Sequence, residues 1–438
     1  MNKANWEKIK KHAAIPALAA AIVVIAAMAI STYRLKDNGT FELRDLSGSR
    51  DAIRDVTIRG ELRDGVHRTR FRVEEGVLRV VTDISSQPYQ SYPYRNSRGG
   101  LVKWGEGMDY SVEDRISSYL ITSWERNETL YSAPVGQTVV DLPIHYRKPE
   151  GASRPNPLMN LAEYGIAVIG ERVFFTVPVS ASFSGVSYIY ELAFYWWGYP
   201  PVNTEDYTPR KIVEIDLDAH KAGGMAGIEI LGMESIGGRL ALLVVENREL
   251  KIKSFDPDNG QFLGEASIPD FQTSNGHAVS GEMRTYQADY EAYVNHDRNL
   301  LTLYFRSSSS DANLSDATIL TLDFTDGVAI VNRTGATFEV GGDDPFDVVS
   351  GMHYRNGKLF VIQSYQVPMT ERSRVKFDWL QSKLLYLYVY EQSKLLYKGE
   401  LVTDLNDDHI HAYNLTPGSG GFGYSQMDYR HFANLEIE

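Results

Sequence analysis

Cysteine is absent from this chain. Without a thiol, the protein forms no disulfide, thiolate zinc site or iron–sulfur cluster, and it uses no cysteine nucleophile or lipid-modified cysteine. An excess of positive charge is missing as well, because 44 Lys and Arg residues stand against 57 Asp and Glu residues, for a net charge of −13. Such a balance gives no field that attracts phosphate backbones. The sequence therefore predicts no nucleic-acid partner.

Motifs that mark common enzymes are also missing. The sequence has no P-loop, no dinucleotide-binding fingerprint in a suitable context, and neither G-x-S-x-G nor H-E-x-x-H. We therefore expect no cofactor, and we expect a binding protein rather than an enzyme. The 438 residues are 43% hydrophobic, which suffices for a large core and excludes global disorder.

One long apolar run lies near the N-terminus. Residues 13–30 read AAIPALAAAIVVIAAMAI, without a charge. As a helix this run is about 27 Å long, which is just enough to cross a bilayer core. It predicts a single transmembrane signal-anchor in contact with lipid. A cleaved signal peptide, processed after Ala29 in an A-x-A pattern, is the alternative.

The charges around this run predict its orientation. Residues 1–12 form a basic tail that carries Lys3, Lys8, Lys10 and Lys11, and basic flanks stay in the cytoplasm. Residues 31–40 then form a linker, and residues 41–438 form an extracytoplasmic domain. A cysteine-free exported chain fits a bacterial cell envelope better than a eukaryotic secretory route. We therefore expect a single-pass protein of the cell membrane with most of its mass outside.

Beyond residue 36 the sequence indicates strands almost throughout. Segments at 170–177, 237–245, 297–305 and 356–363 each begin with a turn residue and continue as an apolar strand. Their first large apolar residues, Val173, Leu240, Leu300 and Leu359, are 67, 60 and 59 positions apart. GVLRVV at 76–81 reads as an earlier copy. Strand–turn–strand segments at 213–224, 251–265, 320–331 and 386–400 complete four units of about four strands each.

This repetition resembles the blades of a β-propeller. The resemblance implies an all-β, β-propeller-like domain with five to seven blades behind the N-terminal helix. Residues 41–82 fit two interpretations. They form a separate membrane-proximal β module, or they supply strands that close the ring from the N-terminal side, and we favour the second because closure protects sheet edges.

Two segments are unusually aromatic for Pro- and Gly-rich loops. Exposed Tyr and Trp side chains dominate binding hot spots, so these residues are the leading candidates for a ligand-binding face. The alternative is that the tryptophans fill a gap between blades. The candidates are Tyr89, Tyr92, Tyr94, Trp104, Trp196 and Trp197.

Two polar clusters are weaker candidates. Asp343, Asp344 and Asp347 lie within five positions, and a pair of carboxylates could catalyse glycoside hydrolysis. His409 and His411 have the i, i+2 spacing that places two imidazoles on one face of a strand, but no third ligand accompanies them, so no metal is predicted. We expect a membrane-anchored envelope protein that binds a protein partner or a cell-wall glycan. A carbohydrate-active hydrolase or lyase with a carboxylate pair is the alternative.

Overall fold

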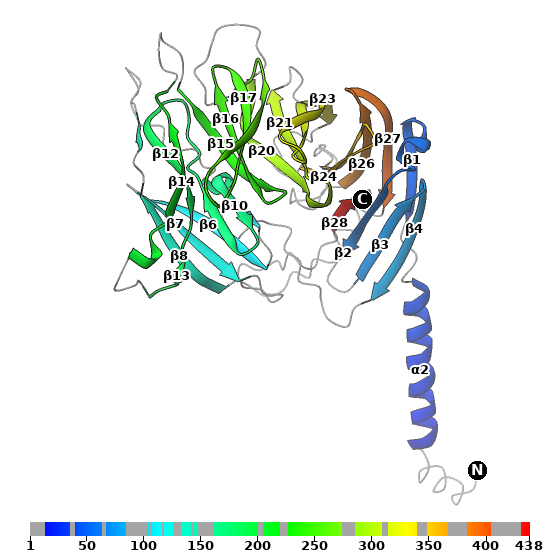
Figure 1. The fold of residues 1–438 in the computed structure, drawn as a ribbon. Helices are drawn as coiled ribbons and strands as arrows, with labels where there is room; N and C mark the ends of the chain where they lie inside the picture. The colour runs from blue at the N-terminus through cyan, green and yellow to red at the C-terminus, as the bar shows by residue number, and fades with distance from the viewer. Residues whose placement is uncertain are drawn as a thin grey trace, which may run out of the picture.

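Among its described residues, the computed structural model consists mostly of strands, and one α-helix precedes them (Figure 1). The structure describes residues 14–35, 40–63, 67–84, 103–104, 107–115, 118–125, 133–141, 144–146, 162–199, 205–219, 227–273, 285–308, 314–339, 348–366, 383–403 and 431–438.

The helix α2 (Ala14–Leu35) projects away from the sheets (Figure 1). Its sequence is mostly Ala, Ile and Val, and its described large apolar side chains, such as Ile15, Val23 and Met28, are all more than half exposed. Among the residues that the structure describes, no helix is long and apolar enough to cross a membrane.

The described strands form six sheets, which we number in chain order. Sheet 1 has the order β28-β2-β3-β4, sheet 2 β13-β8-β7-β6-β5, and sheet 3 β10-β11-β12-β14 with β9 beside β12. Their bounds are β2 (Thr57–Arg63), β3 (His67–Glu74), β4 (Val77–Ile84), β28 (His431–Ile437), β5 (Lys103–Trp104), β6 (Met108–Arg115), β7 (Ser118–Glu125), β8 (Ala133–Asp141), β13 (Tyr195–Trp196), β9 (Ile144–Tyr146), β10 (Ile166–Ile169), β11 (Arg172–Phe175), β12 (Phe183–Glu191) and β14 (Arg210–Asp216).

Sheet 4 has the order β15-β16-β17-β18, sheet 5 β19-β20-β21-β22-β23, and sheet 6 β1-β27-β26-β25-β24. The strands pair antiparallel, apart from the short parallel pair β19–β20. Their bounds are β15 (Glu229–Ile236), β16 (Arg239–Glu246), β17 (Glu249–Phe255), β18 (Phe262–Ile268), β19 (Gln272–Thr273), β20 (Thr285–Asn295), β21 (Leu300–Ser308), β22 (Leu314–Asp323), β23 (Ala329–Glu339), β1 (Phe41–Gly48), β24 (Val348–Arg355), β25 (Lys358–Gln366), β26 (Lys383–Glu391) and β27 (Lys394–Thr403).

The repeat found in the sequence is an interior strand of four consecutive sheets. Val173, Leu240, Leu300 and Leu359 lie in β11, β16, β21 and β25. Of these strands, β11, β16 and β25 lie one strand in from the edge, and β21 is the central strand of sheet 5. The turn before β21 shows why these strands begin where they do, because Asn299 adopts a left-handed φ of 54° that few residues tolerate. The predicted all-β fold of repeated antiparallel sheets is confirmed.

The uninterrupted apolar run in β16 follows from the packing of successive sheets. Leu240, Leu242 and Val244 belong to a core that sheet 4 shares with sheets 2 and 3, whereas Leu243 and Val245 face sheet 5. Both faces of β16 are therefore buried, so this strand carries a continuous apolar run rather than alternating apolar and polar residues. Further cores join sheet 5 to sheet 6 and sheet 6 to sheet 1. No core of described residues spans sheets 1 and 2.

Strands from the two ends of the described β region join the first and last sheets. β1 pairs with β27 as an edge strand of sheet 6, and β28 pairs with β2 as an edge strand of sheet 1. Thr57 and Glu438 exchange two backbone hydrogen bonds, of 2.9 and 3.0 Å. Residues 41–84 thus contribute to two sheets of the propeller-like arrangement. The prediction that GVLRVV at 76–81 is an earlier copy of the repeat was wrong, because this segment lies in β4 at the edge of sheet 1, whereas the four repeat strands are interior strands.

Candidate functional site

Two places in the described structure have the features of a binding site. The first is a group of exposed aromatic side chains after β13, which we call the aromatic surface: Trp196, Trp197 and Tyr199. These side chains are 76%, 50% and 80% exposed. Neither tryptophan fills a gap in a core.

Backbone contacts hold the aromatic surface in place. Trp196 pairs with Gly136 of β8, and the Trp197 amide donates a hydrogen bond to the Val135 carbonyl oxygen at 3.2 Å. The Tyr199 amide donates to the Trp196 carbonyl at 3.1 Å across a turn. The backbone is therefore fixed to sheet 2 while the rings remain in solvent, which reduces the conformational entropy that a ligand would have to overcome.

The other aromatic candidates are not brought to this surface by the described residues. Trp104 lies in β5, where it pairs with Asp109 at the opposite edge of sheet 2 from β13, and its side chain lies outside the described part. Tyr89, Tyr92 and Tyr94 lie outside the described residues. The grouping of all six side chains on one face stays a prediction.

The polar candidates also lie outside the described residues. This holds for Asp343, Asp344 and Asp347, and for His409 and His411. Within the described ranges, no group of three His, Asp or Glu side chains is placed to hold a metal ion.

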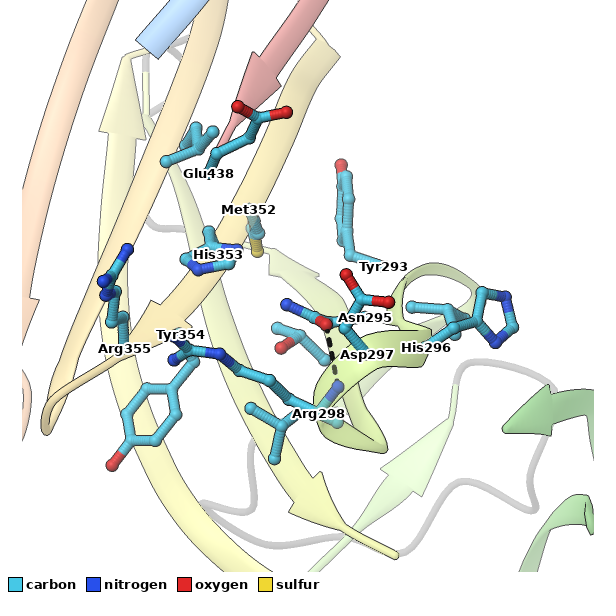
Figure 2. Close-up of a pocket in the computed structure, with 14 residues that line it drawn as sticks. Tyr293, Asn295, His296, Asp297, Arg298, Met352, His353, Tyr354, Arg355 and Glu438 are labelled. Carbon is cyan, nitrogen blue, oxygen red and sulfur yellow. Dashed lines mark hydrogen bonds between the residues drawn. The ribbon is translucent and has the colours of Figure 1, made fainter. Parts of the chain in front are cut away.

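The second place is a cavity of about 570 Å³ where sheets 5, 6 and 1 meet (Figure 2). Its lining comes from the end of β20, the 3-10 turn η5 (His296–Arg298), β21, the end of β24 and the end of the chain beside β2. We call it the β20–β24 cavity. Its lining residues are Tyr293, Val294, Asn295, His296, Asp297, Arg298, Leu300, Thr302, Met352, His353, Tyr354, Arg355, Ile437 and Glu438.

Hydrogen bonds fix the frame of the β20–β24 cavity. The Asn295 side chain caps η5 by accepting from the Arg298 amide at 3.1 Å. The hydroxyls of Tyr293 and Tyr354 donate to the carbonyl oxygens of Val349 and Val331, at 2.6 and 3.1 Å. Both tyrosine hydroxyls are thus engaged with the protein backbone.

Positive charge gathers at one end of the β20–β24 cavity. Figure 2 shows the Arg298 side chain extending from η5 toward His353 and Tyr354 of β24. Burial, together with the positive charges of Arg298 and Arg355, lowers the pKa of His353 to about 4. The imidazole is therefore neutral at pH 7.

Sequence reasoning missed this cavity. Arg298 lies in η5, whereas His353 and Arg355 lie at the end of β24, more than fifty positions away, and no motif joins them. The only available signal was the repeated entry turn, because these residues lie at or just before the turns that lead into β21 and β25.

The chain is similar to known proteins only in its outline. No protein-family model and no curated protein matches it. Among solved structures, a Pseudomonas aeruginosa periplasmic gluconolactonase aligns with 79% of this chain and 99% of its own length, at 10% identity and a TM-score of 0.30. The WD40 domain of Toxoplasma gondii coronin aligns with 84% of this chain and 76% of its own, at 9% identity and a TM-score of 0.30.

A prolyl endopeptidase aligns with 79% of this chain at 8% identity and a TM-score of 0.29. The chain spans 43% of that protein's length. At this level of similarity none of the three assigns an activity to the chain, and the description of its fold rests on its own strand pairing.

Proposed function

We propose that this chain is a membrane-anchored envelope protein that binds a glycan through the aromatic surface. The observation that carries the proposal is the exposure of Trp196, Trp197 and Tyr199 on a fixed backbone. The negative ring faces of Trp and Tyr attract polarised C–H groups such as those of a sugar ring. Three rings within four residues offer a narrow platform of the kind that a sugar ring can cover.

Binding of purified, insoluble cell-wall glycan by the full-length protein in an uncharged detergent tests this proposal. Trp196→Ala and Trp197→Ala should each weaken co-sedimentation about tenfold or more, as loss of a hot-spot ring does. Both variants should keep the melting temperature within ~1 °C, since exposed side chains contribute little to stability. Phe262→Ala, which removes a 52% exposed ring from β18, is the matched control and should bind normally.

Three outcomes would count against a glycan-binding aromatic surface. One is unchanged binding by both tryptophan variants, and another is a clear loss of stability in either. The third is capture of a protein, but not of the glycan, by the wild type. Loss of a hydrolytic activity in Asp343→Asn and Asp347→Asn, with both tryptophan variants active, would favour the carbohydrate-active enzyme instead.

We infer the anchor from α2 and the sequence around it. An isolated helix that exposes apolar side chains on every side is not stable in water, and such helices are buried in a core or in lipid. The 18 uncharged positions of residues 13–30 and the lysines before them support a bilayer crossing with the N-terminus in the cytoplasm. The sheets would then lie outside the membrane.

Membrane extraction tests the anchor. The wild type should stay in the membrane pellet at alkaline pH, whereas Ile22→Lys should shift it to the soluble fraction, because a charge at the centre of a span costs roughly 3 kcal/mol. Leu46→Lys, at a 43% exposed position on β1, is the control and should stay in the pellet. A soluble wild-type form that begins near Ile30 would show that the segment is a cleaved signal peptide.

A further inference from the structure

The β20–β24 cavity contains nitrogen atoms that lack an acceptor. Nε2 of His353 and Nε of Arg355 are buried, and neither has a hydrogen-bond partner within the described structure. The great majority of buried polar atoms in proteins do have one. His353 and Arg355 are two positions apart on β24, so both side chains point to the same side of the strand.

The cavity arginines also differ from other arginines in the chain. Arg68, Arg70 and Arg72 alternate along β3, and each contacts a carboxylate, of Glu61, Asp83 and Glu74 respectively. Neither Arg298 nor Arg355 forms an ion pair with any described residue. Two guanidinium groups at one cavity are therefore left without a negative partner.

The acids that line the cavity do not supply that partner. The Glu438 carboxylate pairs with Arg59 of β2, with 2.5 Å between Oε1 and the guanidinium Nη2. Asp297 lies on the Tyr293 side of the cavity, across from His353 (Figure 2). The positive end of the cavity is therefore open to an anion from outside the protein.

We propose that the β20–β24 cavity binds an organic anion through its carboxylate or phosphate group. The planar guanidinium matches either group with two parallel hydrogen bonds, and the neutral His353 can donate a third from Nε2. The volume of about 570 Å³ exceeds that of a bare ion and falls in the range of small-molecule sites. Leu300, Met352 and Ile437 provide apolar walls for the rest of the ligand. This proposal does not depend on the aromatic surface.

Calorimetric titration of the full-length protein in an uncharged detergent at pH 7 tests the proposal. The probes are phenyl phosphate, benzoate and uncharged benzyl alcohol, which share one ring and differ in the attached group. At least one of the two anions should bind saturably, and at least tenfold more tightly than benzyl alcohol. Tighter binding of phenyl phosphate would assign the site to phosphates, and tighter binding of benzoate to carboxylates.

Arg298→Gln should weaken the preferred anion at least tenfold, because it removes one charge-assisted contact. Arg298 is exposed on a turn, so its substitution leaves the fold intact even if Arg355→Gln does not fold. Arg333→Gln removes the same charge from an exposed position on β23 and should change the affinity less than twofold. The proposal is overturned if neither anion saturates, if benzyl alcohol binds as tightly as the anions, or if Arg298→Gln and Arg333→Gln have equal effects.

Discussion

A buried carboxyl group on β15 should make the stability of this protein depend on pH. Glu229 is 2% exposed, and the Thr273 hydroxyl of β19 donates to its two oxygens at 2.8 and 2.7 Å. Burial raises the pKa of Glu229 to about 7, although the hydrogen bond from Thr273 acts in the opposite direction. The ordinary pKa of a glutamate is 4.5. The folded protein therefore holds a proton on Glu229 that the unfolded chain releases.

The direction in which stability changes with pH follows from this difference in proton binding. Below pH 4.5 the Glu229 carboxyl is protonated in both the folded and the unfolded state, so it does not change the free energy of unfolding. As the pH rises from 4.5 to 7, the unfolded chain ionises first, so the free energy of unfolding falls, and above pH 7 the loss is complete. At 1.36 kcal/mol for each unit of pKa, the total loss is about 3 kcal/mol.

Glu229→Gln removes this loss because an amide does not ionise. The variant should gain about 1 kcal/mol over the wild type at pH 5 and about 3 kcal/mol at pH 8, before any fixed cost of its unpaired N–H groups. That cost is equal at both pH values, so the difference between the two gains is the quantity to measure. With an unfolding entropy of about 2.1 cal/mol/K per residue, it corresponds to a relative shift in melting temperature of ~3 °C.

Thermal unfolding at pH 5 and pH 8, followed by far-UV circular dichroism, measures this shift. Glu214→Gln, on an exposed position of β14, is the control and should shift the melting temperature equally at both pH values. An equal shift at pH 5 and pH 8 for Glu229→Gln would refute the reasoning. It would mean that the folded protein does not hold the proton.

Three further predictions concern the pairing of β1 with β27 and the cavity. Gly48→Ala should lower the melting temperature by several degrees and make β1 sensitive to limited proteolysis. The reason is that Gly48 has a φ of 78°, and an added Cβ would lie 1.9 Å from the Leu396 carbonyl oxygen. Tyr397→Phe should cost about 1 kcal/mol in urea unfolding, since it removes the 2.7 Å hydrogen bond that Tyr397 donates to Asp45. Burial and two arginines lower the pKa of His353 to about 4. Its imidazole should therefore stay neutral at pH 6 in a nitrogen NMR titration of the ligand-free protein. A titration midpoint near pH 6.5 would contradict the buried position of this side chain.

Local chemistry was enough to predict much of the fold. The predicted hairpins at 251–265, 320–331 and 386–400 are β17–β18, β22–β23 and β26–β27, joined by six, five and two residues respectively. Alternating or continuous apolar residues and the intervening turn residues lie within a few positions of one another, so a short window contains the whole signal. At 213–224 the predicted first strand is β14, which ends at Asp216, whereas residues 220–224 of the predicted second strand lie outside the described residues.

The position of a strand within its sheet was harder to predict. GVLRVV at 76–81 has the composition of an interior strand, yet Val77 and Val81 of β4 are 55% and 54% exposed. Strand propensity reports that a segment fits a pleated surface and does not report which neighbours cover it. In sheet 1, β28 from the other end of the chain pairs with β2 and forms one edge. The opposite edge of the sheet is β4.

The same long-range pairing explains why the β20–β24 cavity could not be predicted from sequence. Its lining comes from residues 293–302, 352–355 and 437–438, and none of these segments carries a binding motif alone. Ile437 and Glu438 reach the cavity because β28 pairs with β2 in a register that sets Ile437 opposite Ile58. A one-residue slip would send each β28 side chain to the other face. The cavity thus depends on the pairing of β28 with β2, and Arg298 and Arg355 line it together because sheets 5, 6 and 1 meet there.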